Sequence, residues 1–351
     1  MLRRRRHEDP DVSCRTLVEQ IRRERDDRLR QLMFQDLLAK SSTVRPEVKS
    51  YSVIQALKSF VPEEVASLIP SDKEAIFQKQ KIDVAIVTIK ERELLAAKLA
   101  FDIDLTKPED RNINGFRYWF GKIDRDGNRR NLSVVVTMVG KERNVSCSIA
   151  CQRLFNAFEV GGCFLVGVAA GVRDRTEIGD VVCAEMVVDY EHQRLEPDGP
   201  KKRPDSYRLQ PVMERNLAHF SPRRSGWRNR LSKDLTSVGH EDLPADIRED
   251  WSPEYRQGII LSGEKLIADG RLPTMRDEYH ERTLAAEQEG SGFCRTCEDF
   301  SVPWAVFRGI SDHGDPLKTK GWQVVATLSA STAAAIFVAK EYRTREEMET
   351  F

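Results

Sequence analysis

Three carboxylates in this sequence stand where an apolar segment meets polar residues. Glu93 follows the apolar run IDVAIVTI (82–89), Asp312 ends the stretch VPWAVFRGISD (302–312), and Glu289 opens the glycine-rich stretch EGSG (289–292). Three carboxylates around one pocket suit a reaction with an oxocarbenium-like transition state. One acid protonates the leaving group, one base orients a water, and one carboxylate holds sugar hydroxyls.

Each carboxylate also has a purely structural explanation. Glu93 would stand in the first turn of a helix, where an acidic side chain favours the helix dipole, and Asp312 suits a helix N-cap. Only the combination of the three predicts a site. The small residues of GVAAGV (167–172), with Ala170 among them, would let a ligand approach the backbone.

The segments that carry these residues alternate between strand and helix patterns. The expected strands are 82–89, 132–139, 161–172, 178–190, 258–267 and 303–309, and the expected helices are 91–101, 146–158, 275–298 and 323–342. This alternation predicts an α/β fold with a mixed, largely parallel central sheet flanked by helices. Ligands of such sheets bind beyond the carboxyl ends of the strands, so we expect the carboxylates to meet there.

The chain divides into two parts of different composition. Residues 1–78 carry an arginine-rich start and two amphipathic stretches, which predict an N-terminal helical extension. Such a module is either a packing or oligomerising arm or a site for a protein partner. Residues 79–345 hold the α/β domain, with a charged insertion at about 191–257. The length of this insertion predicts a functional flap or partial disorder.

The overall charge and the cysteine content exclude several classes of protein. Fifty-six basic residues balance 56 acidic ones, so no global field favours nucleic acid or an anionic membrane. No apolar run approaches the roughly 18 residues of a membrane span, and the basic start lacks the apolar core of a secretory signal. Seven cysteines without disulfide-type spacing indicate a reducing compartment, and the lone CRTC (294–297) predicts no metal site. We therefore expect a cytoplasmic protein without metal, cofactor, membrane or nucleic acid.

Residues from about 81 to 342 resemble the nucleoside phosphorylase and nucleosidase superfamily, which includes methylthioadenosine/S-adenosylhomocysteine nucleosidases. The resemblance lies in IVTIKERELLA (86–96), LVGVAAGVRDRTEIGDVV (165–182), LSGEKLI (261–267) and AAEQEGSGFCRTCEDFSVPWAVFRGISDHGD (285–315). It implies that Glu93 activates water and that Asp312 protonates or hydrogen-bonds N7 of a purine. It further implies that Glu289 holds the ribose 2′- and 3′-hydroxyls. The resemblance places the base against Ser311, Leu266 and Ile267.

The sequence departs from the family pattern at several positions. Gln288 and Glu287 stand where a Met and an Asp are usual. Phosphorylases of the superfamily hold inorganic phosphate with arginines and an R-V-G-S strand, but here Leu165 and Val168 stand at the Arg and Ser positions. Because a dianion needs charged donors, the departures favour hydrolysis, with phosphorolysis as one alternative. A nucleotide-sensing or scaffold protein without turnover is the other alternative.

The resemblance implies a purine nucleoside or nucleotide as substrate. Lys141 and Arg143, after the second strand, and the basic insertion would clamp the phosphates of a nucleotide, or equally form a solvated charged surface. Family members commonly form homo-oligomers. Similar nucleosidase domains joined to other modules resemble effectors of bacterial immune systems, so a role in antiviral defence is also implied.

Overall fold

The structure of this chain, a computed structural model, describes residues 79–349 apart from 107–108, 114, 126–128, 240–242, 245–246, 248–250 and 317–320. The helical module expected over residues 1–78, with its role in binding a partner, lies outside the described residues.

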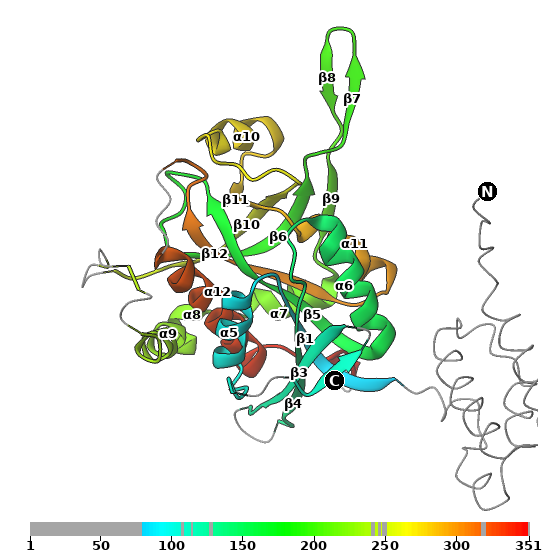
Figure 1. Cartoon of the computed structure of the whole chain (residues 1–351), viewed down its shortest axis with the longest axis vertical. Helices are drawn as coiled ribbons and strands as arrows, with labels where there is room; N and C mark the ends of the chain where they lie inside the picture. The colour runs from blue at the N-terminus through cyan, green and yellow to red at the C-terminus, as the bar shows by residue number, and fades with distance from the viewer. Residues whose placement is uncertain are drawn as a thin grey trace, which may run out of the picture. The chain divides into compact units, whose positions relative to one another are not determined.

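Four parallel strands form the centre of the sheet (Figure 1). They are β4 (Leu132–Met138), β1 (Gln80–Thr88), β5 (Phe158–Gly171) and β12 (Trp304–Asp312), in that spatial order. Every residue of β12 is buried, as expected for a strand that is covered on both faces. The sequence predicted that this strand ends at residue 309, but it continues to Asp312 and so carries that carboxylate to the edge of the sheet.

Three further strands close the central sheet into a ring. β6 (Val181–Asp189), β10 (Tyr255–Ser262) and β11 (Thr283–Glu287) follow β12 in the sheet, and β11 pairs back with β5 in antiparallel fashion. Ala170 of β5 is therefore the register partner of both Asp312 and Ala286. This closure brings the ends of β11 and β12 together beside one residue of β5.

The edges of the sheet are antiparallel. β3 (Phe116–Ile123) pairs with β4, β2 (Arg111–Ile113) pairs with β3, and β9 (Asp205–Arg208) pairs with β6. The apolar pattern of the sequence did not predict β2 and β3. The sheet as a whole is mixed, with parallel pairing at its centre, which confirms the predicted fold class.

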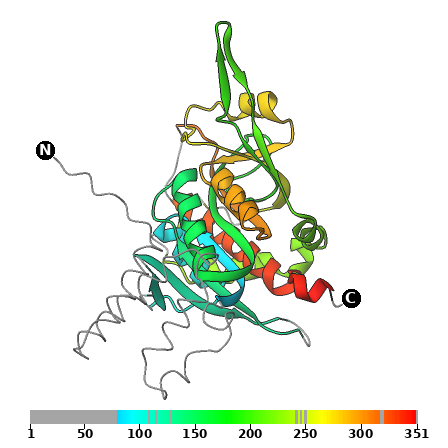
Figure 2. The ribbon, with the colours of Figure 1, turned by 90° about the vertical axis from the view of Figure 1, so that its right-hand side faces the viewer.

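Helices cover both faces of the sheet, as Figures 1 and 2 show. On one face, α5 (Glu91–Ala100), α9 (Trp227–Thr236) and α12 (Gly321–Lys340) pack on one apolar cluster. On the other face, α6 (Asn144–Ala157) and α11 (Gly290–Asp299) pack on a second cluster. Among the described helices, α12 alone is long and apolar enough to cross a membrane, and 78% of that window is buried inside the fold.

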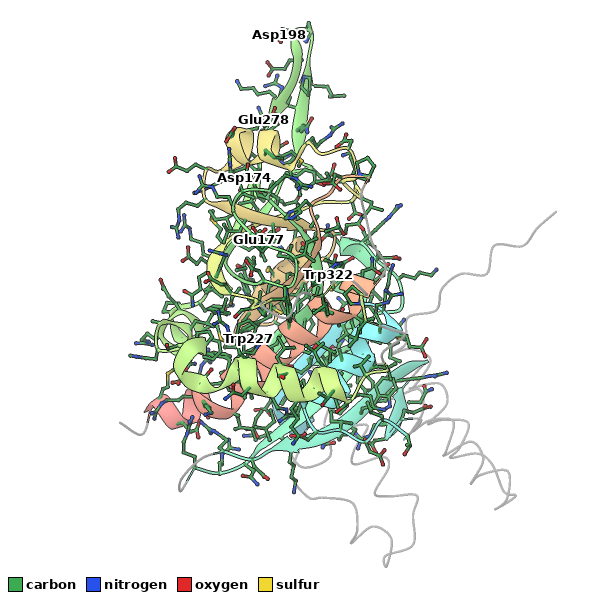
Figure 3. All side chains as sticks on the ribbon, turned by 90° about the vertical axis from the view of Figure 1, so that its left-hand side faces the viewer. Asp174, Glu177, Asp198, Trp227, Glu278 and Trp322 are labelled. Carbon is green, nitrogen blue, oxygen red and sulfur yellow. The ribbon has the colours of Figure 1, made fainter. Side chains whose placement is uncertain are left out.

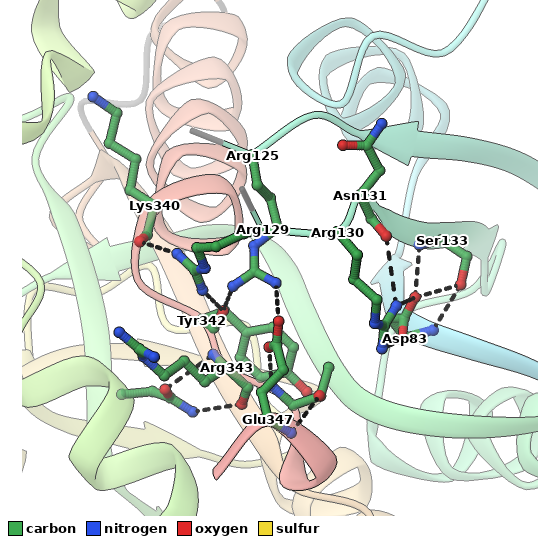
Figure 4. Close-up of polar contacts among 12 residues, drawn as sticks. Asp83, Arg125, Arg129, Arg130, Asn131, Ser133, Lys340, Tyr342, Arg343 and Glu347 are labelled. Carbon is green, nitrogen blue, oxygen red and sulfur yellow. Dashed lines mark hydrogen bonds and ion pairs between the residues drawn. The ribbon is translucent and has the colours of Figure 1, made fainter. Parts of the chain in front are cut away.

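Two arginines between β3 and β4 cap the carboxyl end of α12 (Figure 4). Arg129 donates hydrogen bonds to the carbonyls of Lys340 and Tyr342 at 2.7 and 2.8 Å. Arg125 donates to the Tyr342 carbonyl at 2.7 Å and pairs with Glu347 at 2.5 Å. Cations suit these positions because the last carbonyls of a helix carry partial negative charge.

The prediction of one helix over residues 275–298 is wrong. The chain instead forms α10 (Leu272–Tyr279), then strand β11, then α11 beginning at Gly290. The stretch LAAE favours a helix by intrinsic propensity, but Ala285 and Ala286 are buried between β10 and β5, and tertiary pairing overrides the propensity.

The charged insertion holds regular secondary structure over residues 193–236; the expectation of a functional flap or partial disorder stays a prediction. Its first half is the hairpin of β7 (Gln193–Glu196) and β8 (Gly199–Lys202), with Asp198 at the tip (Figure 3). Its second half holds β9, α7 (Pro211–Ala218), α8 (Pro222–Ser225) and α9. Trp227 of α9 is buried and donates to the Ser329 carbonyl of α12 at 3.2 Å, so this half belongs to the core.

Candidate active site

A cavity of about 280 Å³ lies at the carboxyl ends of β1, β5, β11 and β12. Most of the residues that the sequence singled out line it, namely Glu93, Ala170, Leu266, Ile267, Gln288, Glu289, Ser311 and Asp312. These residues therefore meet at one edge of the sheet, as expected from the rule that ligands bind at the carboxyl ends of the strands. The same cavity is the candidate active site.

Glu93 stands in the first turn of α5 and is only 4% exposed. One carboxylate oxygen accepts hydrogen bonds from the amides of Ile89 and Lys90 at 2.7 and 3.0 Å. The other accepts a bond from the Val168 amide of β5 at 3.1 Å. The amides of the turn between β1 and α5 and of β5 therefore hold this carboxylate in place at the cavity.

Gly167 lets the Glu93 carboxylate approach β5. A β-carbon at this position would lie 2.5 Å from a Glu93 carboxylate oxygen and 2.6 Å from a guanidinium nitrogen of Arg308. Both distances are far below ordinary contact, so a side chain here would displace one group or the other. The glycine gives the backbone a close approach to two charged groups.

Arg308 lies on β12, fully buried between two carboxylates. It forms ion pairs with Glu287 and, at 3.1 Å, with Glu289. Burial disfavours its charge, but Glu287 and Glu289 outweigh burial and hold the pKa of Arg308 above its usual value. Glu287 also accepts hydrogen bonds from the amides of Glu289 and Gly290 at 2.9 to 3.0 Å.

The negative charge of Glu289 has fewer hydrogen-bond and ion-pair partners than that of Glu287. One of its oxygens accepts a hydrogen bond from the Arg143 amide at 3.1 Å, and the other pairs with Arg308. Burial raises the pKa of Glu289 to about 7, against the lowering effect of Arg308 and with a further rise from Glu287. This carboxyl therefore titrates near neutral pH.

Asp312 is held by the turn that follows β12. One of its oxygens accepts a hydrogen bond from the Ser311 hydroxyl at 3.0 Å, and the other accepts one from the Gly314 amide at 2.8 Å. The carboxylate is 8% exposed. His313 bonds through Nδ1 to the Gly171 carbonyl at 3.2 Å and so stabilises the turn.

The loop after β10 forms the apolar side of the cavity. Leu266 is 70% exposed at the mouth, and Ile267 follows it. The side-chain amide of Gln288 donates to the Glu264 carbonyl at 3.2 Å, which fastens this loop to the end of β11.

The structure does not place the Lys141 and Arg143 side chains in the cavity. Both side chains are exposed on the loop after β4, where Arg143 has a φ of 87° and contributes its amide to Glu289. The expectation that these side chains clamp phosphates therefore lacks support. The cations that line the cavity are Lys90, Arg92 and Lys265, and no described basic residue of the insertion does so.

The sequence did not reveal that these cations line the cavity, nor that Glu287 and Arg308 lie in one charged cluster with Glu289. A signal existed for two of the cations, because Lys90 and Arg92 flank Glu93 in IKERELL. Arg308 precedes the acid in the stretch RGISD, but its pairing across the ring becomes visible only once β11 is known to be a strand.

Among the described residues, no group of three or more His, Cys, Asp and Glu side chains has the geometry of a metal site. Cys294 and Cys297 are buried in the second apolar cluster, where they pack as small apolar side chains.

Comparisons with known proteins show which family this chain is similar to. The family profile of the phosphorylase superfamily matches residues 83–341. The chain is 29% identical over 263 residues to ATP nucleosidase Cap17 of Escherichia coli strain KTE188, a match that covers 73% of this chain and 50% of that protein. It is 23% identical to the 5′-methylthioadenosine/S-adenosylhomocysteine nucleosidase of Haemophilus ducreyi, over 74% of this chain and 97% of that protein.

Solved structures share the fold. The 5′-methylthioadenosine/S-adenosylhomocysteine nucleosidase of Neisseria meningitidis, in complex with methylthio-immucillin-A, superposes with a TM-score of 0.51 at 16% identity, over 73% of this chain and 98% of that one. Futalosine hydrolase of Helicobacter pylori gives a TM-score of 0.50 at 17% identity, over 75% and 98%. The chain spans half the length of the ATP nucleosidase that it matches. With the family profile covering most of the described residues, this chain belongs to the phosphorylase superfamily.

Proposed function

We propose that this chain is a purine nucleosidase that hydrolyses the N-glycosidic bond of a nucleoside or nucleotide. The observation that carries the proposal is the convergence of Glu93, Glu289 and Asp312 on one cavity from three different elements. Each carboxylate has a different set of partners, so each is suited to a different task. The nucleosidases named above, to which the chain is similar, support the same reaction class.

Each of the three carboxylates has a different role in the proposed reaction. Glu93 takes a proton from water as the water oxygen bonds to C1′ of the ribosyl group. The bond between C1′ and the purine nitrogen breaks, its electron pair goes to the base, and Asp312 delivers a proton to N7. Glu289 accepts hydrogen bonds from the 2′- and 3′-hydroxyls and stabilises the positive charge that develops on the ring.

Water is a better nucleophile than inorganic phosphate in this cavity. Ile89, Val168 and Ala169 line the cavity with apolar side chains, so its charged donors are confined to Lys90, Arg92 and Lys265. The Glu93 carboxylate itself would repel a phosphate placed beside it. A water molecule, in contrast, needs a base that is fixed in place, and three amides fix Glu93.

Release of free base tests the proposal. The full chain is incubated with adenosine, AMP, ATP, methylthioadenosine and inosine, and free base is measured by chromatography. We expect base release from at least one purine substrate and a fall of about 10² to 10⁴-fold in the Glu93→Gln variant. Base release that is unchanged in Glu93→Gln would rule out the assigned mechanism, and no release from any substrate would rule out the function.

The finer points of function are also proposals. A nucleotide substrate is suggested by the similarity to an ATP nucleosidase. A role as a defence effector, a homo-oligomeric state and a protein partner rest on the family resemblance alone. Size-exclusion chromatography with light scattering tests the oligomer directly, because a monomer would contradict it.

A further inference from the structure

Two cations lie at one end of the candidate active site. Lys90 and Arg92 both line the cavity; Lys90 is the N-cap residue of α5, and Arg92 lies in the first turn of α5 beside Glu93. Two hydrogen bonds tie the turn between β1 and α5 to the Glu93 carboxylate, at the amides of Ile89 and Lys90. The backbone that carries the two basic side chains is therefore held close to Glu93, the residue proposed to activate water.

Both cations lie at the N-terminus of a helix, where the helix dipole disfavours positive charge. α5 begins at Glu91, with Lys90 as its N-cap residue and Arg92 in its first turn. The positive end of the helix dipole favours acidic side chains there, and lysine has no acceptor with which to cap a helix. Two cations at this helix end are therefore poorly explained by the stability of the fold. An anion between them would compensate both.

The two cations and the residues proposed to bind the base come from different parts of the cavity lining. One part of the cavity lining, Lys265 with Leu266 and Ile267, also lines a second hollow next to α10. Arg92 instead also lines a third hollow, between α5 and α12. The turn that carries Asp312 lies at the end of the cavity bordered by the second hollow, because the Gly270 amide donates a hydrogen bond to the Gly314 carbonyl at 2.8 Å. With the base at that end and the ribose against Glu289, the 5′ end of the substrate points toward Lys90 and Arg92.

We propose that Lys90 and Arg92 bind the 5′-phosphate groups of the substrate, so that the enzyme acts on purine nucleotides in preference to nucleosides. This assignment rests on the proposed nucleosidase function, and it names the side chains that select the substrate. Both cations have replaceable partners in the present structure. Lys90 pairs with Glu142, which is partly exposed and also lines the cavity, and Arg92 donates to the neutral side chain of Gln323 in the first turn of α12.

Arg92 is the stronger of the two candidates. Among the residues that the structure describes, no carboxylate pairs with it. Its guanidinium group also offers a planar fork of donors that matches phosphate oxygens. Lys265 lines the cavity too, but it pairs with Glu191 and stands beside Leu266 at the base end.

The test compares ATP with adenosine as substrates of the full chain. Free adenine is measured by chromatography for the wild type, for Lys90→Gln, for Arg92→Gln and for the double variant. We expect the wild type to favour ATP over adenosine in kcat/KM. Each single variant should lower kcat/KM for ATP about tenfold, mainly through KM, and the double variant about 100-fold, because each removes a charge-assisted contact. The kcat/KM for adenosine should fall much less than that for ATP, so the ratio of the two values is the readout.

Matched controls separate a specific effect from a loss of surface charge. Lys81→Gln removes an exposed lysine at the other end of β1 that pairs with Glu159, and Arg295→Gln removes an exposed arginine that pairs with Asp299 on α11. Both control variants should keep the wild-type preference for ATP. Arg92→Glu provides a charge reversal, and circular dichroism confirms the fold of each variant. We expect Arg92→Glu to favour adenosine over ATP.

A binding measurement keeps the inference separate from the catalytic proposal. Titration calorimetry of the Asp312→Asn variant with ATP and with adenosine measures the preference without turnover. Tighter binding of ATP, lost when Lys90→Gln and Arg92→Gln are added, supports the inference even if no base is released. Equal binding of ATP and adenosine would overturn it, even if base release succeeds.

Two further results would also overturn the assignment. If Lys141→Gln lowers the preference for ATP and Lys90→Gln does not, the phosphates bind on the loop after β4. If inorganic phosphate accelerates base release from adenosine, and Arg92→Gln abolishes that effect, the cations hold a phosphate nucleophile. We expect phosphate to compete with ATP and to leave the reaction of adenosine unchanged.

Discussion

Replacement of Arg308 by methionine removes the only cation from a buried cluster of charges in the described site. Arg308, Glu287 and Glu289 have side-chain exposures of 1%, 2% and 7%, so water does not screen them. Methionine has a similar length and is apolar, so it fills the space without replacing the charge. Glu287 keeps its three amide hydrogen bonds in the variant, whereas Glu289 keeps only the Arg143 amide.

The expected loss of stability is large and depends on pH. Removal of one partner from a buried ion pair costs about 3–5 kcal/mol of the free energy of unfolding. The pKa of Glu289 is already raised from 4.5 to about 7, and loss of the guanidinium raises it further. A carboxyl with a raised pKa adds stability below its unfolded pKa and loses that contribution as pH rises through the folded value. The variant should therefore be least stable, relative to wild type, at pH 8 and closest to wild type at pH 5.

Urea unfolding followed by circular dichroism at both pH values measures this difference. Arg282→Met is the matched control, because Arg282 pairs with Glu185 at the surface, with side-chain exposures of 58% and 36%, and its loss should cost about 1 kcal/mol or less. The double variant Arg308→Met/Glu287→Gln should recover part of the loss at pH 8. A loss for Arg308→Met that equals the control, or one that does not change with pH, would refute this reasoning.

Three further predictions concern catalysis. Asp312→Asn should lower kcat by about 10² to 10⁴-fold with little change in nucleotide affinity, and unchanged base release would show that Asp312 is not the general acid. Because Glu289 must be ionised to accept both ribose hydroxyls and its pKa is raised to about 7, kcat/KM should fall as pH drops below about 7. A profile that stays flat between pH 6 and 8 would contradict that assignment. Gly167→Ala would place a methyl group 2.5 Å from Glu93 and should lower kcat about 10²-fold, so wild-type turnover in this variant would disprove the close packing.

Much of the sheet follows from continuous apolar runs. The run IDVAIVTI predicts β1 because a strand that is covered on both faces needs apolar residues at every position. The rule that ligands bind at the carboxyl ends of strands then brings Glu93, Ala170 and Asp312 to one edge. The roles assigned to these side chains stay predictions.

The remaining features depend on contacts that are distant in sequence. Ala285 and Ala286 have the propensity of a helix, and only their pairing with β10 and β5 makes β11 a strand. The sequence also drew attention to the Arg143 side chain, whereas the fold uses its backbone amide. Similarly, the importance of Arg92 appears only when Gln323 of α12 is seen beside it at the cavity mouth.

The most direct measurement follows the ribosyl product with and without inorganic phosphate. The wild-type chain is incubated with its best purine substrate, free base is quantified by chromatography, and phosphorus NMR detects ribose 1-phosphate species. A water molecule activated by Glu93 predicts equal rates of base release in both conditions and a free ribosyl product. Base release that requires phosphate and yields a ribose 1-phosphate would contradict hydrolysis at this carboxylate site.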